Sequence, residues 1–181
     1  MKGIAAWIWI IGSLILGMMV FVMGSTIFFG QLEARLKQSA TDNFYDITYK
    51  IKRTCTEGGL GEVYHYKTFA VPEIVRAVYS ANESEQMPPD KVSLYISDGR
   101  SASGKYFCIN YFGDDLPICQ AVDCSIDATY MGMPSAKPSI FGMVARLMSE
   151  GSIYKTYKYY VLINKTNTSF VAVKATPIIG Q

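Results

Sequence analysis

The chain has 181 residues, half of them hydrophobic, and its 17 lysine and arginine residues nearly balance 15 aspartate and glutamate residues to give a net charge of +2. This length suits one domain, or one domain with an appendage. Because the chain is almost neutral and has no block of like charges, it gives no electrostatic basis for nucleic-acid binding and does not indicate a charged disordered tail. Much of the hydrophobic excess lies near the N-terminus.

The first element is an apolar run over residues 4–29 that contains no charged side chain. A helix of about 20 apolar residues crosses the hydrocarbon core of a bilayer, so this run is long enough to span a membrane with some tilt. Trp7 and Trp9 stand near one end, and Phe28 and Phe29 near the other, as aromatic residues often do at membrane interfaces. We therefore predict a transmembrane helix within residues 1–30.

The flanking residues favour one orientation and one kind of anchor. Lys2 precedes the run, which favours a cytoplasmic N-terminus and an extracytoplasmic C-terminal domain in the cell membrane. A cleaved secretory signal fits less well, because its apolar core is usually about 7–15 residues long and Val22-Met23-Gly24 is a poor cleavage site. A buried helix of a soluble protein is the third interpretation.

Small residues recur within the apolar run. Ser13, Gly17 and Gly24 fall on roughly one face of a helix, where they would let a second helix approach closely. The alternative is that these glycines reflect only the general frequency of glycine in membrane helices.

Residues 31–57 keep a helical pattern but become polar on one side. Apolar side chains recur every three or four residues, which is the spacing of one helix face. These residues, called the apolar stripe below, are Leu32, Leu36, Ala40, Phe44, Ile47 and Ile51. No proline occurs before Pro72, so we expect the membrane helix to continue as an amphipathic helix to about Arg53. Either the domain that follows or the same helices of other copies could cover the stripe.

Residues 58–181 are predicted to form a β-rich extracytoplasmic domain. Three glycines in "EGGLGE" end the helix, and segments rich in Val, Ile, Tyr, Phe and Thr then alternate with turn-forming stretches. One short helix is expected between an N-cap at Ser139 and a stop at Gly151. The fold class is therefore α+β, with a mainly antiparallel sheet. The expected strands are 63–71, 74–80, 92–97, 105–112, 125–131, 154–163 and 169–176.

Four cysteines follow the membrane run, and their even number favours two disulfides in an oxidising compartment. Three pairings are open to Cys55, Cys108, Cys119 and Cys124. We expect Cys119–Cys124 to close a short loop and Cys55–Cys108 to tie the helix end to the sheet. Free thiols are the alternative, and the absence of a C-x-x-C pair argues against zinc.

Asparagine sequons mark candidate glycosylation sites. Three N-x-[ST] patterns begin at Asn82, Asn164 and Asn167, all in turn-like stretches of the presumed exterior. Plain polar turns would give the same pattern.

The sequence predicts no catalytic residue, cofactor, metal site or small-molecule substrate. The pattern G-x-x-x-x-G-K ends at Lys105, but Tyr106 stands where a phosphate-binding loop needs Ser or Thr. Asp114 and Asp115 are adjacent and lack the spaced oxygen ligands of a calcium site. His65 is the single histidine of the chain and alternates with tyrosines, as an ordinary strand residue would.

The order of these parts resembles that of archaeal type IV pilin-like proteins. In that family a short basic leader ends in glycine and is cleaved after it, and a hydrophobic helix continues into an amphipathic half and a β-rich head. The resemblance implies a leader of residues 1–3 that is cleaved after Gly3, a helix from Ile4 onward, and a head of residues 58–181. The fifth position after Gly3 is Ile8, where bacterial members have glutamate and archaeal members often do not.

The sequence thus predicts a non-enzymatic, single-pass protein of the cell surface, and the resemblance implies a filament subunit that assembles through its N-terminal helix. The expected partners are the membrane and either copies of the chain or a membrane complex, with no nucleic acid. One alternative is an accessory subunit whose Ser13, Gly17 and Gly24 pack against a larger membrane complex. Another is an anchored enzyme with an unrecognised site.

Overall fold

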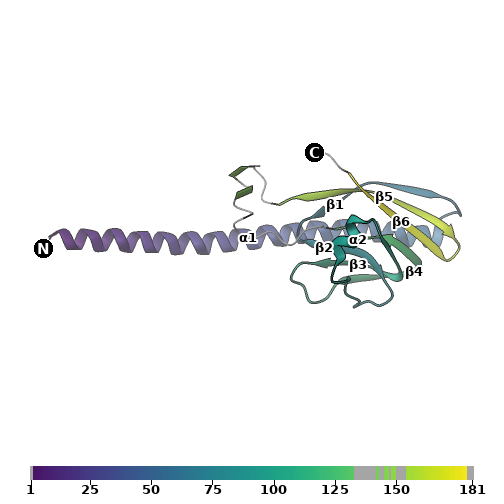
Figure 1. Cartoon of the computed structure of the whole chain (residues 1–181), viewed down its shortest axis with the longest axis horizontal. Coiled ribbons are helices and arrows are strands. Elements are labelled where there is room, and N and C mark those ends of the chain that lie inside the picture. Colours follow the sequence, from purple (N-terminus) through teal and green to yellow (C-terminus); the bar gives the residue numbers. More distant parts are fainter. Residues whose placement is uncertain (1, 133–141, 143–144, 147, 150–153, 179–181) are drawn as a thin grey trace. The chain divides into compact units, whose positions relative to one another are not determined.

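The structure is a computed structural model that describes residues 2–132, 142, 145–146, 148–149 and 154–178. The chain divides into two compact units, Met1–Leu36 and Lys37–Gln181. The order of helices and strands along the chain is α1, β1, β2, α2, β3, β4, β5 and β6 (Figure 1).

Helix α1 (Lys2–Glu57) includes both the apolar run and the apolar stripe, so the predicted continuous helix is confirmed. In the first unit it is helical from Lys2 onward, and its large apolar side chains between Trp9 and Phe28 are exposed. In the second unit the same helix places Ala40, Phe44 and Ile47 in the core. The periodicity of three and four residues therefore predicted both the helix and its buried face.

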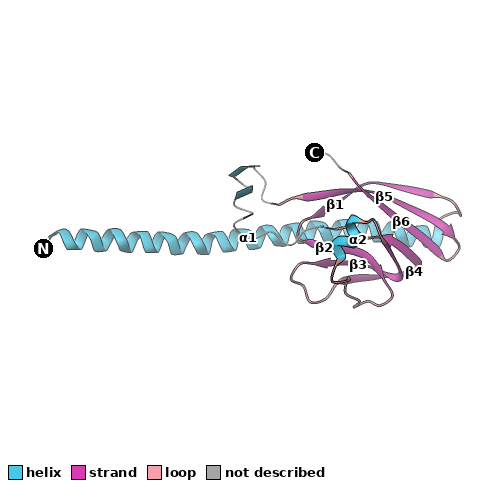
Figure 2. Cartoon of the chain, viewed as in Figure 1, coloured by secondary structure: helices cyan, strands magenta, loops and turns pink. Residues whose placement is uncertain are grey.

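The second unit is built on a six-stranded sheet within the described part of the chain (Figure 2). Its spatial order is β1-β5-β6-β4-β3-β2, and every neighbouring pair is antiparallel except β4 with β6. This mixed, mostly antiparallel sheet fits the predicted α+β class. The strands are β1 (Val63–Pro72), β2 (Val75–Ala81), β3 (Ser101–Tyr111), β4 (Ile118–Thr129), β5 (Thr156–Asn167) and β6 (Phe170–Pro177).

One predicted strand is wrong. Residues 92–97 form the short helix α2 (Val92–Ser97). Val92 is buried, and Tyr95 and Ile96 pack beside it against the same cluster, so the apolar side chains lie at positions i, i+3 and i+4 of a helix turn. The β-branched and aromatic residues of this segment favoured a strand locally, but burial of one face overrode that preference.

The predicted helix from Ser139 to Gly151 lies mostly outside the described residues. Its described members Gly142, Ala145, Arg146, Met148 and Ser149 are helical.

The two faces of the sheet bury different groups. One face of β3, β4 and β5 carries Phe107, Cys124 and Lys165, which contact α1. On the other face of β2 and β3, Tyr79 and Cys108 pack with α2. β3 is consequently buried on both sides from Phe107 to Tyr111, and four of these five residues are apolar or aromatic, the exception being Asn110.

Candidate functional site: the apolar helix and its locked C-terminal end

The first part of α1 meets the requirements of a membrane span. It is the one helix among the described residues that is long and apolar enough to cross a bilayer. Its hydroxyl groups bond to the helix itself, since Ser13 Oγ donates to Ile10 O at 2.9 Å and Ser25 Oγ donates to Val22 O at 2.8 Å. Such internal hydrogen bonds lower the cost of placing polar groups in lipid.

The predicted helix-packing residues lie on the exterior of α1. A Cβ atom built on Gly17 or Gly24 would meet no other atom within 4 Å, and Ser13 is exposed. The backbone at these positions is open to close approach by another helix. Whether they pack against one remains a prediction.

The part of the apolar stripe within residues 40–51 is buried against the sheet of the same chain. Phe44 has no exposed surface, and its ring stacks on Phe107 of β3 at 5.4 Å between centroids. Ile47 and Ile51, one and two turns further along, are also fully buried. For this part of the stripe the covering partner is therefore the domain that follows, which was one of the two alternatives open at the sequence level.

Polar contacts fix α1 along the same path. Thr41 Oγ1 lies 2.6 Å from the hydroxyl of Tyr111, and Lys37 Nζ pairs with Asp114 Oδ2 at 2.5 Å. Lys37 also lies over the Tyr111 ring, 4.9 Å from its centroid. Asp114, which the sequence analysis rejected as a calcium ligand, therefore contributes to docking α1.

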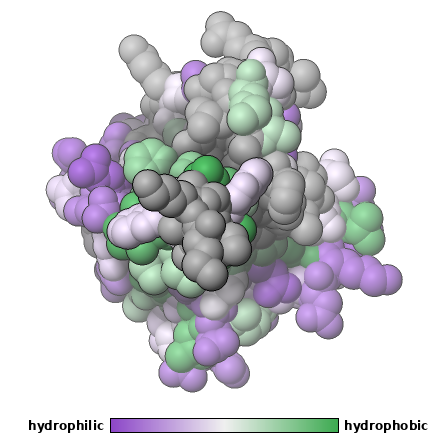
Figure 3. Space-filling view, turned by 90° about the vertical axis from the view of Figure 1, so that its left-hand side faces the viewer, coloured by the Kyte–Doolittle hydropathy of each residue, from purple (hydrophilic) through white to green (hydrophobic). Residues whose placement is uncertain are grey.

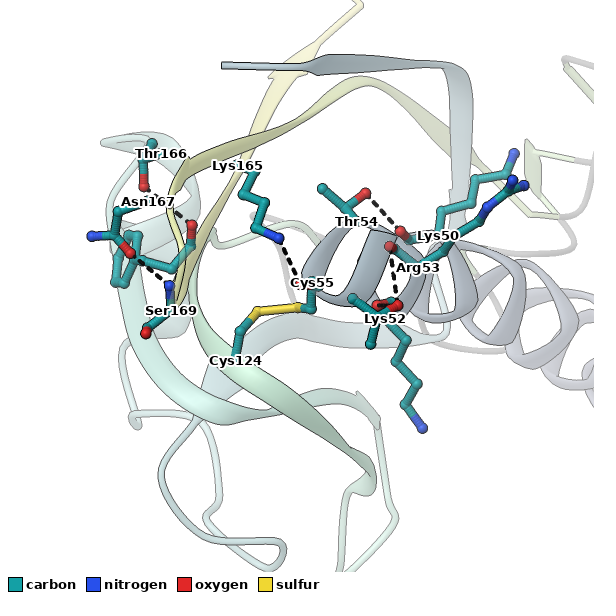
Figure 4. The surroundings of a disulfide bond; sticks show 12 residues. Lys50, Lys52, Arg53, Thr54, Cys55, Cys124, Lys165, Thr166, Asn167 and Ser169 are labelled. Atoms are coloured by element: carbon teal, nitrogen blue, oxygen red, sulfur yellow. Dashed lines mark hydrogen bonds between the residues drawn. A yellow bond between two sulfur atoms is a disulfide. The ribbon is translucent and has the colours of Figure 1, made fainter. Parts of the chain in front are cut away.

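The C-terminal end of α1 is held by a disulfide and a buried cation (Figure 4). Cys55 is bonded to Cys124 of β4. Lys165 of β5 is only 8% exposed, and its Nζ donates to Cys55 O at 2.7 Å. The last carbonyls of a helix lack intrahelical donors and carry partial negative charge. The last turn of α1 supplies no basic residue, so the sheet provides the cation that the helix end favours.

Gly58 completes this helix end. Its N–H donates to Thr54 O at 3.2 Å. A Cβ atom at this position would lie 2.6 Å from that carbonyl oxygen, so the chain leaves the helix where glycine permits close backbone approach. The break predicted from the glycines of "EGGLGE" is confirmed.

The expected cysteine pairing is wrong, although two disulfides are present. Cys119 and Cys124 lie on the same strand, β4, five positions apart. An extended strand separates such residues by roughly 17 Å and points them to opposite faces, whereas a disulfide needs Cα atoms within about 7 Å. The second disulfide instead joins Cys108 to Cys119, which are directly opposed on β3 and β4 with 4.1 Å between Cα atoms.

An ion pair with a buried carboxylate was not predicted. Glu73, between β1 and β2, has a fully buried side chain, and its Oε2 accepts a hydrogen bond from Arg146 Nη1 at 2.6 Å. The arginine side chain is 29% exposed. The pair connects the start of β2 with the segment between β4 and β5. A glutamate in a stretch of apolar residues, "FAVPEIV", was the available signal for a buried carboxylate.

We expect the two members of this pair to respond unequally to substitution. Arg146→Met leaves the buried Glu73 carboxylate without its cation and should lower the free energy of unfolding by about 3 kcal/mol. Glu73→Gln leaves an arginine that water can reach, so its cost should be smaller, about 1–2 kcal/mol. Denaturant unfolding of the detergent-solubilised chain, followed by near-UV circular dichroism, measures both. A larger loss for Glu73→Gln would contradict the assignment.

Four tyrosines have phenol groups whose ionisation is opposed mainly by burial. Burial raises the pKa of Tyr79, Tyr111, Tyr130 and Tyr159 above the usual value. The Tyr159 hydroxyl donates to Gly132 O at 2.8 Å, and the Tyr79 hydroxyl donates to Gln86 O at 2.6 Å. These phenols therefore hold their protons more tightly in the folded chain than in the unfolded chain.

The second unit should consequently lose stability in alkali. With the pKa raised on folding, the stabilisation is complete below the unfolded-chain pKa of about 10 and disappears as the pH rises through the higher folded values. We expect these tyrosines to ionise together with unfolding, observed as a coincident change in tyrosinate absorbance and near-UV circular dichroism. Complete ionisation of all tyrosines in a chain that keeps its native spectrum would contradict this.

The candidate residues for metal binding do not gather in the described part of the chain. No group of three or more His, Cys, Asp or Glu side chains there could hold a metal ion. His65 pairs with Leu162 across β1 and β5 as a strand residue.

Figure 3 shows hydrophilic side chains around much of the rim of one face, with hydrophobic side chains between them.

No protein-family model, curated protein or solved structure matches the chain.

Proposed function

We propose that the chain is a non-enzymatic, membrane-anchored protein of the cell surface that assembles through its N-terminal helix, as a pilin-like filament subunit of the archaeal kind. One observation carries the proposal. Helix α1 is continuous from Lys2 to Glu57 and exposes its large apolar side chains between Trp9 and Phe28, whereas its apolar side chains at positions 40, 44, 47 and 51 are buried in the second unit. The exposed apolar part is thus the surface that a membrane or other copies would cover.

The cysteines support the proposed side of the membrane. Disulfides persist in oxidising compartments, and the two bonds lie within the second unit. We place the N-terminus in the cytoplasm and the disulfide-bonded domain outside, with Gly3 as the proposed end of a cleaved leader. In this orientation Lys2 lies on the cytoplasmic side, as the distribution of positive charge favours.

The burial of Phe44 and Ile51 restricts how copies could assemble. These side chains are covered within one chain, so a bundle of α1 helices would have to form from residues that precede them. Close packing of apolar helices in lipid depends on small residues rather than on hydrophobic burial. Ser13, Gly17 and Gly24 supply such residues, and the open space around them also favours the alternative, an accessory subunit packed against a different membrane protein.

Paired glycine variants test the assembly. Gly17→Ile fills the proposed packing face, whereas Gly12→Ile adds the same side chain about 100° around the helix from Ser13, and both positions have open space. After cross-linking in native membranes, we expect self-linked ladders and filaments from the parent chain and Gly12→Ile but not from Gly17→Ile. Cross-links to a different multi-pass protein would favour the accessory subunit. Monomers alone would contradict both.

A further inference from the structure

The three sequons lie in different structural settings. Asn164 is within β5, opposite Val63 of β1 and Ala172 of β6. Its Oδ1 is buried and has no hydrogen-bond partner among the described residues. The Asn164 sequon is therefore part of a strand that is paired on both sides, and its middle residue, Lys165, is buried. A sequon held in this way is poorly placed to enter the active site of another enzyme.

Asn167 lies at the exposed tip of the β5–β6 hairpin. Its Oδ1 accepts a hydrogen bond from the backbone N–H of Ser169 at 2.9 Å, which is an Asx turn. Residues 166–169 are all exposed. Figure 4 shows the Asn167 amide nitrogen pointing away from Ser169. Asn167 Nδ2, the atom that would receive a glycan, and Ser169, the hydroxyl residue of the sequon, are thus both at the surface.

Asn82 lies in a second exposed turn, directly after β2. Its backbone N–H donates to Gln86 Oε1 at 2.9 Å, and Gln86 N–H donates to Glu83 O at 3.3 Å. Residues 82–87 are exposed. This turn presents its sequon outside the sheet, as the hairpin tip does.

We infer that Asn82 and Asn167 are N-glycosylation sites and that Asn164 is not. The inference rests on the proposed function, because the head must lie on the side of the membrane where glycans are transferred. The donor would be an oligosaccharide joined through phosphate to a polyprenyl lipid. Under an oligosaccharyltransferase, Nδ2 of asparagine bonds to the anomeric carbon, and the bond from that carbon to the phosphate oxygen breaks. The lipid phosphate leaves with the electron pair, and one Nδ2 proton passes to a base of the transferase.

Asn82 and Asn167 differ from Asn164 in the space that an attached glycan would enter. At Asn82 and Asn167 the added sugar extends from a turn into solvent. At Asn164 it would have to extend from the middle of a strand that is paired on both sides and whose asparagine Oδ1 is buried. A chain modified at Asn164 before folding would be hindered from closing β5 against β1 and β6.

Peptide mass spectrometry of the full chain from the membranes of its host tests the inference. We expect glycan on the Asn82 and Asn167 peptides and none on Asn164. Asn82→Gln and Asn167→Gln should each remove one glycan, and the matched control Asn164→Gln should remove none. Ser169→Ala should also abolish modification of Asn167, because it destroys the sequon and keeps the asparagine.

The disulfides separate failure of this inference from failure of the proposed function. Absence of glycan in a chain that carries the Cys55–Cys124 disulfide would overturn the inference and leave the proposed exterior location standing. Glycan on Asn164 of such a chain would also overturn it. Absence of glycan together with four reduced cysteines would overturn both, since the head would then not have reached an oxidising compartment.

Discussion

Replacing Cys55 and Cys124 by serine should lower the free energy of unfolding of the head by about 4 kcal/mol. The residues are 69 positions apart, and the entropy removed from the unfolded chain by a cross-link grows with loop length. The Cys108–Cys119 disulfide closes only 11 positions, so its removal should cost about 3 kcal/mol on the same basis. Losing the first bond also frees the end of α1 beside Lys165.

Denaturant unfolding of the detergent-solubilised full chain, without reductant, measures both losses. The doubly substituted Cys108→Ser and Cys119→Ser chain is the matched control, because it also lacks two cysteines and the one disulfide that they form. A larger loss in this control than in the Cys55 and Cys124 double variant would contradict the view that the long cross-link secures the helix to the sheet.

Phe44→Ala should lower the free energy of unfolding by about 3–5 kcal/mol. The side chain is fully buried and stacks on Phe107, so truncation removes apolar burial and leaves a cavity between α1 and the sheet. Tyr49→Ala is the matched control on the same helix, since Tyr49 is 64% exposed. Its substitution should cost no more than about 0.5 kcal/mol.

Unfolding of the two variants side by side separates docking of α1 from simple helix propensity. Both substitutions replace an aromatic residue of a helix by alanine, so the change in helix propensity shifts the free energy of unfolding in the same direction in both variants. If Phe44→Ala were as stable as Tyr49→Ala, the second half of α1 would not be a core element of the head.

The sequence predicted the long helix because its period is explicit over many turns. The steps from Leu32 to Ile51 are all three or four residues, and the core contains Ala40, Phe44 and Ile47 as that pattern requires. Six of the seven predicted strands also overlap observed strands. Here local alternation and turn residues agree with the final environment.

Other features depended on contacts that local patterns do not contain. The α2 segment looks like a strand until Val92, Tyr95 and Ile96 are seen to share one buried face. The pairing of Cys108 with Cys119 follows from the register of β3 and β4, which one sequence does not specify. Recognising Cys119 and Cys124 as members of one strand would have excluded their pairing.

The sequence could have predicted part of the contact between Lys165 and the C-terminal end of α1. Lys165 keeps the odd-numbered phase of Val161 and Ile163, which are buried on the face toward α1. Strand alternation therefore indicated a buried lysine. Its acceptor, the carbonyl of Cys55, lies 110 positions earlier in the chain, and that contact required the folded arrangement.

The most direct test of the central claim, a membrane anchor that bears an exterior disulfide-bonded head, is the unreduced intact mass and N-terminal sequence of the chain extracted from carbonate-washed host membranes. The account predicts a membrane-retained chain that keeps residues 4–29 and lacks four hydrogens relative to the reduced form. An N-terminus at Ile4 would further support pilin-type processing. A soluble chain that begins near Ser25, or a membrane chain with four free thiols, would contradict the account.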